Sequence, residues 1–191
     1  MTWNLEGFSR NIYNLKYFSC YEPDFIMLSK PQIYQNDIEL FMTHLKREYC
    51  YSLNTADKYD PELPLVKLKA HGGTLVLWKV GHDPFISVHP VSSPSILPII
   101  FNPPNNRISI HVAVYLPTHG QDSKFVEELS SLEVCLHELH DLYPHAPLYL
   151  RGDFNVNANN TKRTALLARF WESFDLIEPQ NLSSFCWQWE Q

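Results

Sequence analysis

Polar and charged side chains stand at several points where an expected strand ends, and their types suit metal binding or acid-base chemistry. These residues are Asn4, Glu6, Lys30, Tyr115, Asp153 and Asn155. Side chains at strand ends project from a rigid scaffold into a crevice, which is where α/β proteins commonly bind ligands. A carboxylate beside an amide suits a hard cation or an attacking water. The sequence therefore indicates one site built from the ends of several strands.

Asp153 and Asn155 flank Phe154 directly after Gly152. In an extended turn both polar side chains can point the same way while the phenyl ring anchors the segment in the core. The same spacing also suits an Asx turn that closes a strand, and Asn4 also suits a turn before Gly7. The residues alone leave these readings open.

Alternating strand and helix patterns must position these residues. Strands are expected from period-two or continuous apolar runs at Thr2–Leu5, Asp24–Ser29, Thr74–Trp78, Phe85–His89, Ile96–Phe101, Arg107–Leu116 and Leu148–Leu150. Helices are expected from apolar residues at helical spacing in Arg10–Cys20, Asn36–Lys46, Asp122–Leu142 and Thr164–Phe174. The sequence contains no repeat or linker, so we expect one mixed α/β domain over residues 1–191.

The composition is that of a globular protein and does not exclude nucleic acid. The chain has 191 residues, of which 45% are hydrophobic and 19% charged, and this excludes a disordered or low-complexity chain. The net charge is −6, which disfavours a general nucleic-acid binder. However, the expected helix at 122–142 carries −5 of it, from six acids and one lysine. The acidity therefore belongs mainly to one helix and says little about a crevice elsewhere.

Cysteine usage and hydropathy indicate an intracellular, non-secreted protein without a membrane partner. Four cysteines lie far apart without a C-x-x-C pair, so the sequence suggests neither a zinc site nor a disulfide framework. No apolar run has the length of a signal peptide or of a membrane span.

Five short motifs, in order, resemble those of the endonuclease/exonuclease/phosphatase superfamily. They are TWNLEG (2–7), PDFIMLS (23–29), GGTLVL (72–77), VYLPTHG (114–120) and GDFNV (152–156). Within that superfamily they are most similar to the apurinic-type endonuclease domain of non-LTR (LINE-type) retrotransposons. The resemblance covers essentially the whole chain and implies a DNase I-like α/β sandwich of four layers, with two facing sheets and helices outside.

The resemblance also implies a chemistry, a cofactor and a partner. Members hydrolyse phosphate esters with Mg²⁺ or Mn²⁺, and the retrotransposon branch nicks DNA. By motif, Asn4 binds metal or phosphate and Glu6 lies beside the metal. Tyr115 hydrogen-bonds the scissile phosphate, Asp153 positions or deprotonates the attacking water or assists the leaving group, and Asn155 stabilises the oxyanion. His119, in the loop after Tyr115, is a candidate phosphate contact, and an ordinary loop histidine is the alternative.

The sequence departs from the family at the second strand. Where members have Leu-Gln-Glu, with the glutamate as principal metal ligand, this chain reads Leu28-Ser29-Lys30. A protonated ammonium has no lone pair for a metal and repels it. Either Lys30 occupies the place of the metal and pairs with Asp153 or Glu6, or it turns to solvent and metal binds weakly through the remaining ligands.

A second departure lies at the C-terminus. Ser183–Trp189 resembles the start of the family's aromatic strand, but the terminal Asp-His pair has no counterpart before Gln191. We therefore expect a C-terminally truncated sandwich that lacks its last strands. If the chain is a fragment, a downstream reverse-transcriptase domain is the expected partner.

Three functions follow from these patterns, and whether the chain is an enzyme stays open. The first is a Mg²⁺-dependent DNA endonuclease domain, impaired or inactive because of Lys30. The second is a non-catalytic retrotransposon relic or a nucleic-acid-binding pseudoenzyme. The third is a phosphatase of the same fold.

Overall fold

The structure is a computed structural model, and it describes most of the chain. The described residues are 2–4, 21–34, 38–45, 48–55, 72–104, 106–156, 161–177 and 187–190. The expected helix Arg10–Cys20 and the candidate metal-site residue Glu6 lie outside these ranges, as does much of the expected aromatic segment Ser183–Trp189.

The first sheet has the strand order β1-β2-β4-β3. Its strands are β1 (Thr2–Asn4), β2 (Phe25–Ser29), β3 (Tyr49–Asn54) and β4 (Thr74–Lys79). β1 and β2 run parallel, so Asn4 lies beside Ser29 at their carboxyl ends. The other pairs are antiparallel.

The second sheet has the order β5-β6-β7-β8-β9. Its strands are β5 (Ile86–Val88), β6 (Ile96–Phe101), β7 (Ser109–Tyr115), β8 (Leu148–Asp153) and β9 (Trp187–Glu190). β7 and β8 are parallel, which brings Tyr115 beside Asp153 at their carboxyl ends. Both sheets are therefore mixed, and each contains one parallel pair.

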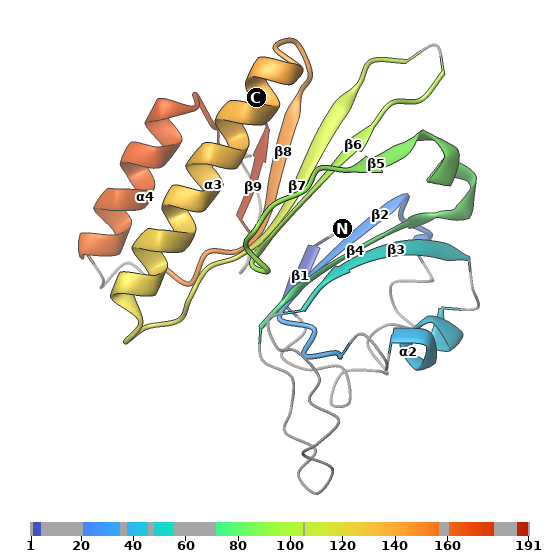
Figure 1. Ribbon diagram of the computed structural model, residues 1–191, viewed down its shortest axis with the longest axis horizontal. Coiled ribbons are helices and arrows are strands. Elements are labelled where there is room, and N and C mark those ends of the chain that lie inside the picture. Colours follow the sequence, from blue (N-terminus) through green and yellow to red (C-terminus); the bar gives the residue numbers. More distant parts are fainter. Residues whose placement is uncertain are drawn as a thin grey trace, which may run out of the picture.

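Helices cover the outer faces of the two sheets (Figure 1). They are α2 (Ile38–His44), α3 (Asp122–Leu142) and α4 (Thr161–Ser173), whereas the short 3₁₀ helix η2 (Val80–Phe85) connects β4 of the first sheet to β5 of the second. In Figure 1, α3 and α4 lie on the second sheet and α2 lies on the first. α3 forms over the expected residues because its apolar stripe at steps of four and three is buried: Phe125, Leu129, Leu132, Leu136 and Leu139.

Three hydrophobic clusters fill the spaces between four layers. One lies between the second sheet and helices α3 and α4, and another between the first sheet and α2. The third joins the two sheets. Strand alternation explains this division, because Leu75 and Leu77 of β4 face α2 whereas Val76 faces the other sheet. The chain is therefore a two-sheet α/β sandwich.

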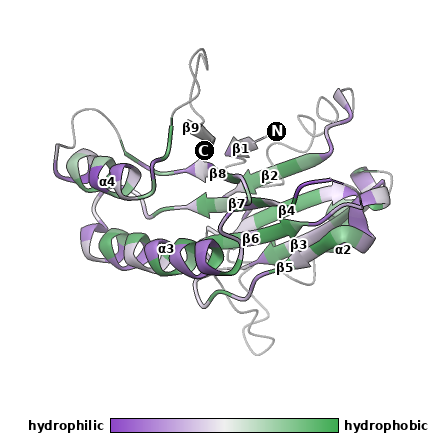
Figure 2. Cartoon of the chain, turned by 90° about the horizontal axis from the view of Figure 1, so that it is seen from above, coloured by the Kyte–Doolittle hydropathy of each residue, from purple (hydrophilic) through white to green (hydrophobic). Residues whose placement is uncertain are grey.

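Figure 2 agrees with this layering. The central strands β2, β4, β6 and β7 are strongly hydrophobic, while α3 alternates between hydrophobic and hydrophilic residues. β2 is buried along almost its whole length, as its continuous apolar run predicts. Among the described residues, no helix is long and apolar enough to cross a membrane.

Several expected elements are confirmed, and two regions differ. β6 and α3 have the expected bounds. β3 is a strand that the sequence patterns did not indicate. Pro84 lies inside η2, so the strand expected at Phe85–His89 shortens to Ile86–Val88.

Candidate functional site

The ends of β1 and β8 join the two sheets through a pair of polar side chains. Asn4 Nδ2 donates a hydrogen bond to Asp153 Oδ2, across 149 positions of sequence. Both side chains are half-buried, so solvent reaches them. This contact brings together one candidate residue from each end of the chain.

The turn after β8 fixes the other carboxylate oxygen. The backbone N–H of Asn155 donates to Asp153 Oδ1 at 3.0 Å, which is the Asx turn that the sequence left open. Phe154 is 1% exposed and packs in the core, as expected for the anchor of this segment. The turn therefore orients the carboxylate, and Oδ2 remains the oxygen that faces Asn4.

Asn155 is held by both its backbone and its side chain. Its φ is 49°, in the left-handed region that asparagine tolerates better than most residues. Its Nδ2 donates to Leu116 O at 2.7 Å, and Leu116 N donates back to Asp153 O at 2.9 Å. The turns that follow β7 and β8 are thus hydrogen-bonded to each other.

Tyr115 completes the group on the face of β7 that looks toward the first sheet. It is in register with Asp153 on the neighbouring parallel strand, and its side chain is half-buried. Its backbone N–H donates to Ser95 O at 2.8 Å. Tyr115, Asp153, Asn155 and Asn4 therefore meet at one edge of the sandwich.

A row of polar side chains in the first sheet closes this edge, and only Asn4 of this row was predictable from the sequence. We call Asn4, Ser29, Thr74 and Asn54 the polar row, because each is in register with the next across the sheet. The last three donate to backbone carbonyls of the facing layer: Ser29 Oγ to Val114 O (3.0 Å), Thr74 Oγ1 to Pro94 O (3.2 Å) and Asn54 Nδ2 to Ile96 O (2.8 Å). The sheets converge here, and Figure 1 shows them spreading apart toward the other end. Each residue ends or begins its strand, which is the signal that could have found the row.

Gly152 permits the close approach of β8 and β7 at this edge. Its φ is 153°, and a Cβ at this position would lie 1.8 Å from Val114 O. The same carbonyl accepts the hydrogen bond from Ser29. A side chain at Gly152 would therefore disturb the junction directly beside Asp153.

Arg163 is a second component that sequence reasoning missed. Its side chain is 2% exposed and bonds to the turns after β7 and β8 and to Asp122. It shares the inward face of α4 with Leu167 and Phe170, at helical spacing. An arginine on an apolar stripe is the signal that could have indicated it.

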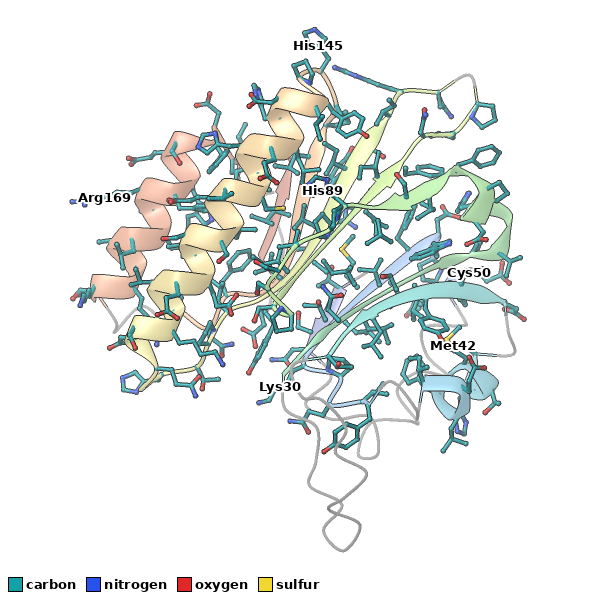
Figure 3. All side chains as sticks on the ribbon, viewed as in Figure 1. Lys30, Met42, Cys50, His89, His145 and Arg169 are labelled. Atoms are coloured by element: carbon teal, nitrogen blue, oxygen red, sulfur yellow. The ribbon has the colours of Figure 1, made fainter. Side chains whose placement is uncertain are left out.

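Lys30 lies at the end of β2, at the convergent edge of the sheets (Figure 3). Its φ is 54°, and its N–H donates to Gly73 O at 3.0 Å. In the part of the chain that the structure describes, Lys30 forms no ion pair, so the pairing with Asp153, one of the alternatives that the sequence left open, is absent. The other expected partner, Glu6, lies outside the described residues.

The described donor set does not by itself fit a divalent cation. Among these residues, no three His, Cys, Asp or Glu side chains come together as a metal site would require. Asp153 is the carboxylate of the group, Asn4 already donates its amide to it, and Lys30 ends the adjacent strand. A hard cation takes several oxygen ligands, so this set is too small and too positive for one.

His119 is exposed in the loop between β7 and α3. It directly precedes Gly120, whose φ of 89° lies in a region that glycine adopts without the strain that a side chain would cause. His119 lies four residues after Tyr115, the last residue of β7, in the loop that leaves the sheet at this edge of the sandwich.

No protein-family model matches the chain, and no curated protein does. Solved structures do match. The human Nocturnin catalytic domain with bound sulfate has a TM-score of 0.70 and 14% identity, over 98% of this chain and 79% of that one. TDP2 of D. rerio, in complex with a single-strand DNA product, has a TM-score of 0.60 and 11% identity, over 100% of this chain and 82% of that one.

The 3′ phosphatase NExo from Neisseria, bound to a product DNA hairpin, has a TM-score of 0.56 and 11% identity; the match covers 81% of this chain but only 56% of NExo. These proteins have the sandwich of the endonuclease/exonuclease/phosphatase type. This chain has the DNase I-like fold. At such low identity the likeness extends to the DNase I-like fold and not to a reaction.

Chemically, the edge offers an oriented carboxylate, two amides and a phenol. Asp153 keeps lone pairs for a further hydrogen bond or a proton from water. Tyr115 supplies a hydroxyl that can donate or accept. Such a set can bind a phosphate ester, whose oxygens accept hydrogen bonds, and can hold a water beside it.

Proposed function

We propose that this chain is a DNA-binding DNase I-like domain, derived from a magnesium-dependent retrotransposon endonuclease, whose phosphodiester hydrolysis is impaired by Lys30. The supporting observation is that one edge of the sandwich keeps the polar residues of the family site but has a lysine where the family has its metal ligand. Asn4, Asp153 and Asn155 form a hydrogen-bonded set there. The strand next to β1 is followed directly by Lys30, at the position where a metal-dependent site of this family needs a carboxylate.

DNA is the proposed ligand for two reasons. Structures of similar fold hold a single-strand DNA product in TDP2 and a DNA hairpin in NExo. Six of the acidic residues that dominate the net charge lie on α3, which packs against the outer face of the second sheet, whereas the polar row belongs to the first sheet. Tyr115, Asn155 and His119 are the proposed contacts for the phosphodiester, with Lys30 supplying positive charge to the DNA backbone.

A plasmid-nicking assay tests the proposal, with Mg²⁺ or Mn²⁺ in the buffer. We expect no nicking by the wild type, metal-dependent nicking by Lys30→Glu, and loss of that gain in Lys30→Glu with Asp153→Ala. The matched control is Lys79→Glu, which reverses the charge of a lysine at the opposite end of β4. Nicking by the wild type that Asp153→Ala abolishes would show that hydrolysis is not impaired.

DNA binding is measured separately, because we propose that the domain binds DNA even though its hydrolysis is impaired. Fluorescence anisotropy of a labelled single-strand oligonucleotide in EDTA is expected to report binding that weakens in Lys30→Glu and as salt rises. Absence of binding at low salt by a folded wild type contradicts the DNA-binding part.

Two alternatives share the site. A fully non-catalytic relic predicts that Lys30→Glu stays inactive although it folds. A phosphatase predicts release of inorganic phosphate from a 3′-phosphorylated oligonucleotide, without nicking of plasmid. The retrotransposon origin is tested by the encoding DNA beyond the codon for Gln191, where an open frame leading into an Asp-His motif and a reverse transcriptase supports it.

A further inference from the structure

Arg163 lies in the first turn of α4, yet its side chain is as buried as the hydrophobic core. Its exposed fraction is 2%, equal to that of Leu167 one turn later. A buried charge is costly unless it is paired and hydrogen-bonded throughout. The partners of Arg163 therefore indicate what the burial achieves.

All five N–H groups of the guanidinium have an acceptor. Nε donates to Asp122 Oδ1 at 2.8 Å, and Nη2 reaches the same oxygen at 2.7 Å. Nη2 also donates to Thr118 O at 3.0 Å. Nη1 donates to Pro117 O at 2.7 Å and to Asn155 O at 3.4 Å. The planar fork of arginine is thus fully used.

These acceptors come from three separate segments. Pro117 and Thr118 belong to the turn after β7, Asn155 to the turn after β8, and Asp122 begins α3. The guanidinium also lies over the Phe125 ring, 4.4 Å from its centroid, which fixes its plane. One side chain therefore connects the turns that follow Tyr115 and Asp153.

We propose that Arg163 is a positioning residue, which sets where the Asn155 amide lies relative to Tyr115 and so keeps the phosphate-binding edge in one geometry. Asn155 is held from two sides: its carbonyl accepts from Arg163 while its side chain donates to Leu116 O. Loss of the first contact frees the turn to rotate about the second. The placement of the turns needs no assumption about activity; its consequence for DNA rests on the proposed function.

A lysine cannot replace this residue. Its ammonium has three donors on a flexible stem, so it can pair with Asp122 but cannot reach both turns in the fixed directions of the fork. If Arg163 only stabilised the fold, the charge and aliphatic stem of a lysine would largely replace it. If Arg163 positions the two turns, a lysine leaves them misplaced.

The test uses the side-chain amide resonance of Asn155 in ¹⁵N NMR, assigned by its disappearance in Asn155→Asp. In Arg163→Lys we expect this resonance to move toward the position of an exposed amide and its protons to exchange faster. The matched control is Leu167→Ala, which destabilises the same helix from a buried position and removes no hydrogen bond to either turn. We expect that control to leave the amide resonance in place.

A second variant covers the case in which Arg163→Lys does not fold. Asp122→Asn changes a side chain that is 59% exposed, and it weakens the grip on the guanidinium without removing the contacts to the turns. We expect a smaller shift of the Asn155 amide in the same direction. An unmoved resonance in both variants, or an equal shift in Leu167→Ala, would overturn the proposal.

The binding arm uses the labelled single-strand oligonucleotide in EDTA. We expect Arg163→Lys to weaken binding about tenfold or more, because the hydrogen bonds of a misplaced amide are lost. If the wild type binds no DNA, the proposed function fails while the NMR arm still decides the role of Arg163. If the amide shifts but DNA binding is unchanged, Asn155 is not a DNA contact and the positioning of the site is refuted.

Discussion

Asn4 and Asp153 are 149 positions apart, yet the amide of Asn4 donates directly to the Asp153 carboxylate. The first residue ends β1 in one sheet and the second ends β8 in the other. The contact therefore connects the two sheets at the candidate site, and its charge balance depends on Asn4 being neutral.

Asn4→Asp places two carboxylates in this contact. Two close carboxylates cannot both ionise easily, so we expect the pKa of the pair to be raised and the folded state at pH 7 to lose about 2 kcal/mol relative to wild type. For a domain of this size that corresponds to a fall in Tm of about 4–8 °C. Thermal melts followed by circular dichroism measure it.

The pH dependence distinguishes repulsion from a lost hydrogen bond. Because the raised pKa belongs to the folded state, the stability of Asn4→Asp relative to Asn4→Ala should increase as the pH falls and the pair takes up a proton. Asn4→Ala removes the amide without adding charge and serves as the matched control. A difference between the two variants that does not change with pH contradicts the contact.

Gly152 is the position where the backbone of β8 tolerates no side chain. Gly152→Ala puts a Cβ 1.8 Å from Val114 O at a φ of 153°, so strands β7 and β8 must separate. We expect a loss of at least about 3 kcal/mol, a large share of the stability of an ordinary domain. Urea denaturation of the purified variant measures the loss, and failure to fold is its extreme outcome.

Alanine variants of two other glycines distinguish the steric clash of a Cβ from the strain of a positive φ. Gly120→Ala meets no atom within 4 Å but keeps a φ of 89°, so we expect a loss of only about 1 kcal/mol. Gly81→Ala meets neither problem and should be close to neutral. Equal losses for all three variants would mean that the close approach of β7 and β8 is unimportant.

The fold was predictable wherever one pattern dominates a segment. β6 and α3 have the expected bounds because a continuous apolar run and a regular stripe each allow one answer. β3 was not predictable: only its first residue is buried, and its alternation of aromatic and polar side chains is weak. Its pairing with β4 decides its conformation, and that partner lies far along the chain.

The site was predictable only in part, for a related reason. Tyr115 and Asp153 end parallel strands, so their proximity follows from the topology that the patterns suggest. Arg163 and Ser29 were missed because they bond to backbone carbonyls of Pro117 and Val114, which carry no sequence signature and lie 46 and 85 positions away. Lys30 was identified from the motif, but its lack of an ion pair with Asp153 required the structure.

His111 gives the protein an acid-sensitive core. It is 7% exposed and lies stacked between Phe25 and Tyr149, with ring centroids 4.7 and 4.9 Å away. Burial, reinforced by the nearby charge of Arg151, lowers the pKa of His111 from 6.5 to about 3. The ring is therefore neutral in the folded protein across the physiological range.

The lowered pKa of His111 determines whether acid stabilises or destabilises the fold. Between pH 6.5 and pH 3 the unfolded chain binds a proton at this site that the folded chain does not, so acid destabilises the fold. We expect this group to contribute a loss on the order of 4 kcal/mol over that window, and none of it above pH 6.5. Urea denaturation at several pH values measures the slope.

His111→Phe keeps a ring in the stack and removes the titration. We expect a smaller fall in stability between pH 6.5 and pH 3 than in the wild type, even if the variant is less stable at neutral pH. His140→Gln, which removes an exposed histidine of α3, is the matched control and should keep the wild-type slope. The same slope in His111→Phe as in the wild type means that other groups cause the acid sensitivity.

We expect Lys30 to prevent the edge from binding a divalent cation. Lys30 directly follows β2, whose last residue Ser29 is in register with Asn4, and its positive charge repels a cation at this edge, so we expect Mg²⁺ to leave the Tm of the wild type unchanged. Lys30→Glu adds a carboxylate at the edge where, among the described residues, Asp153 already supplies one. At Mg²⁺ a hundredfold above its Kd, stabilisation of about 2.7 kcal/mol is expected, reversed by EDTA.

Lys30→Gln separates the loss of a positive charge from the gain of a ligand. It removes the ammonium and adds an amide, so Mg²⁺ should stabilise it far less than Lys30→Glu. Adding Asp153→Asn to Lys30→Glu should abolish the effect, because the cation then loses the Asp153 carboxylate. Saturable Mg²⁺ stabilisation of the wild type, sensitive to Asp153→Asn, would instead mean that Lys30 turns to solvent and leaves the remaining ligands free to bind metal.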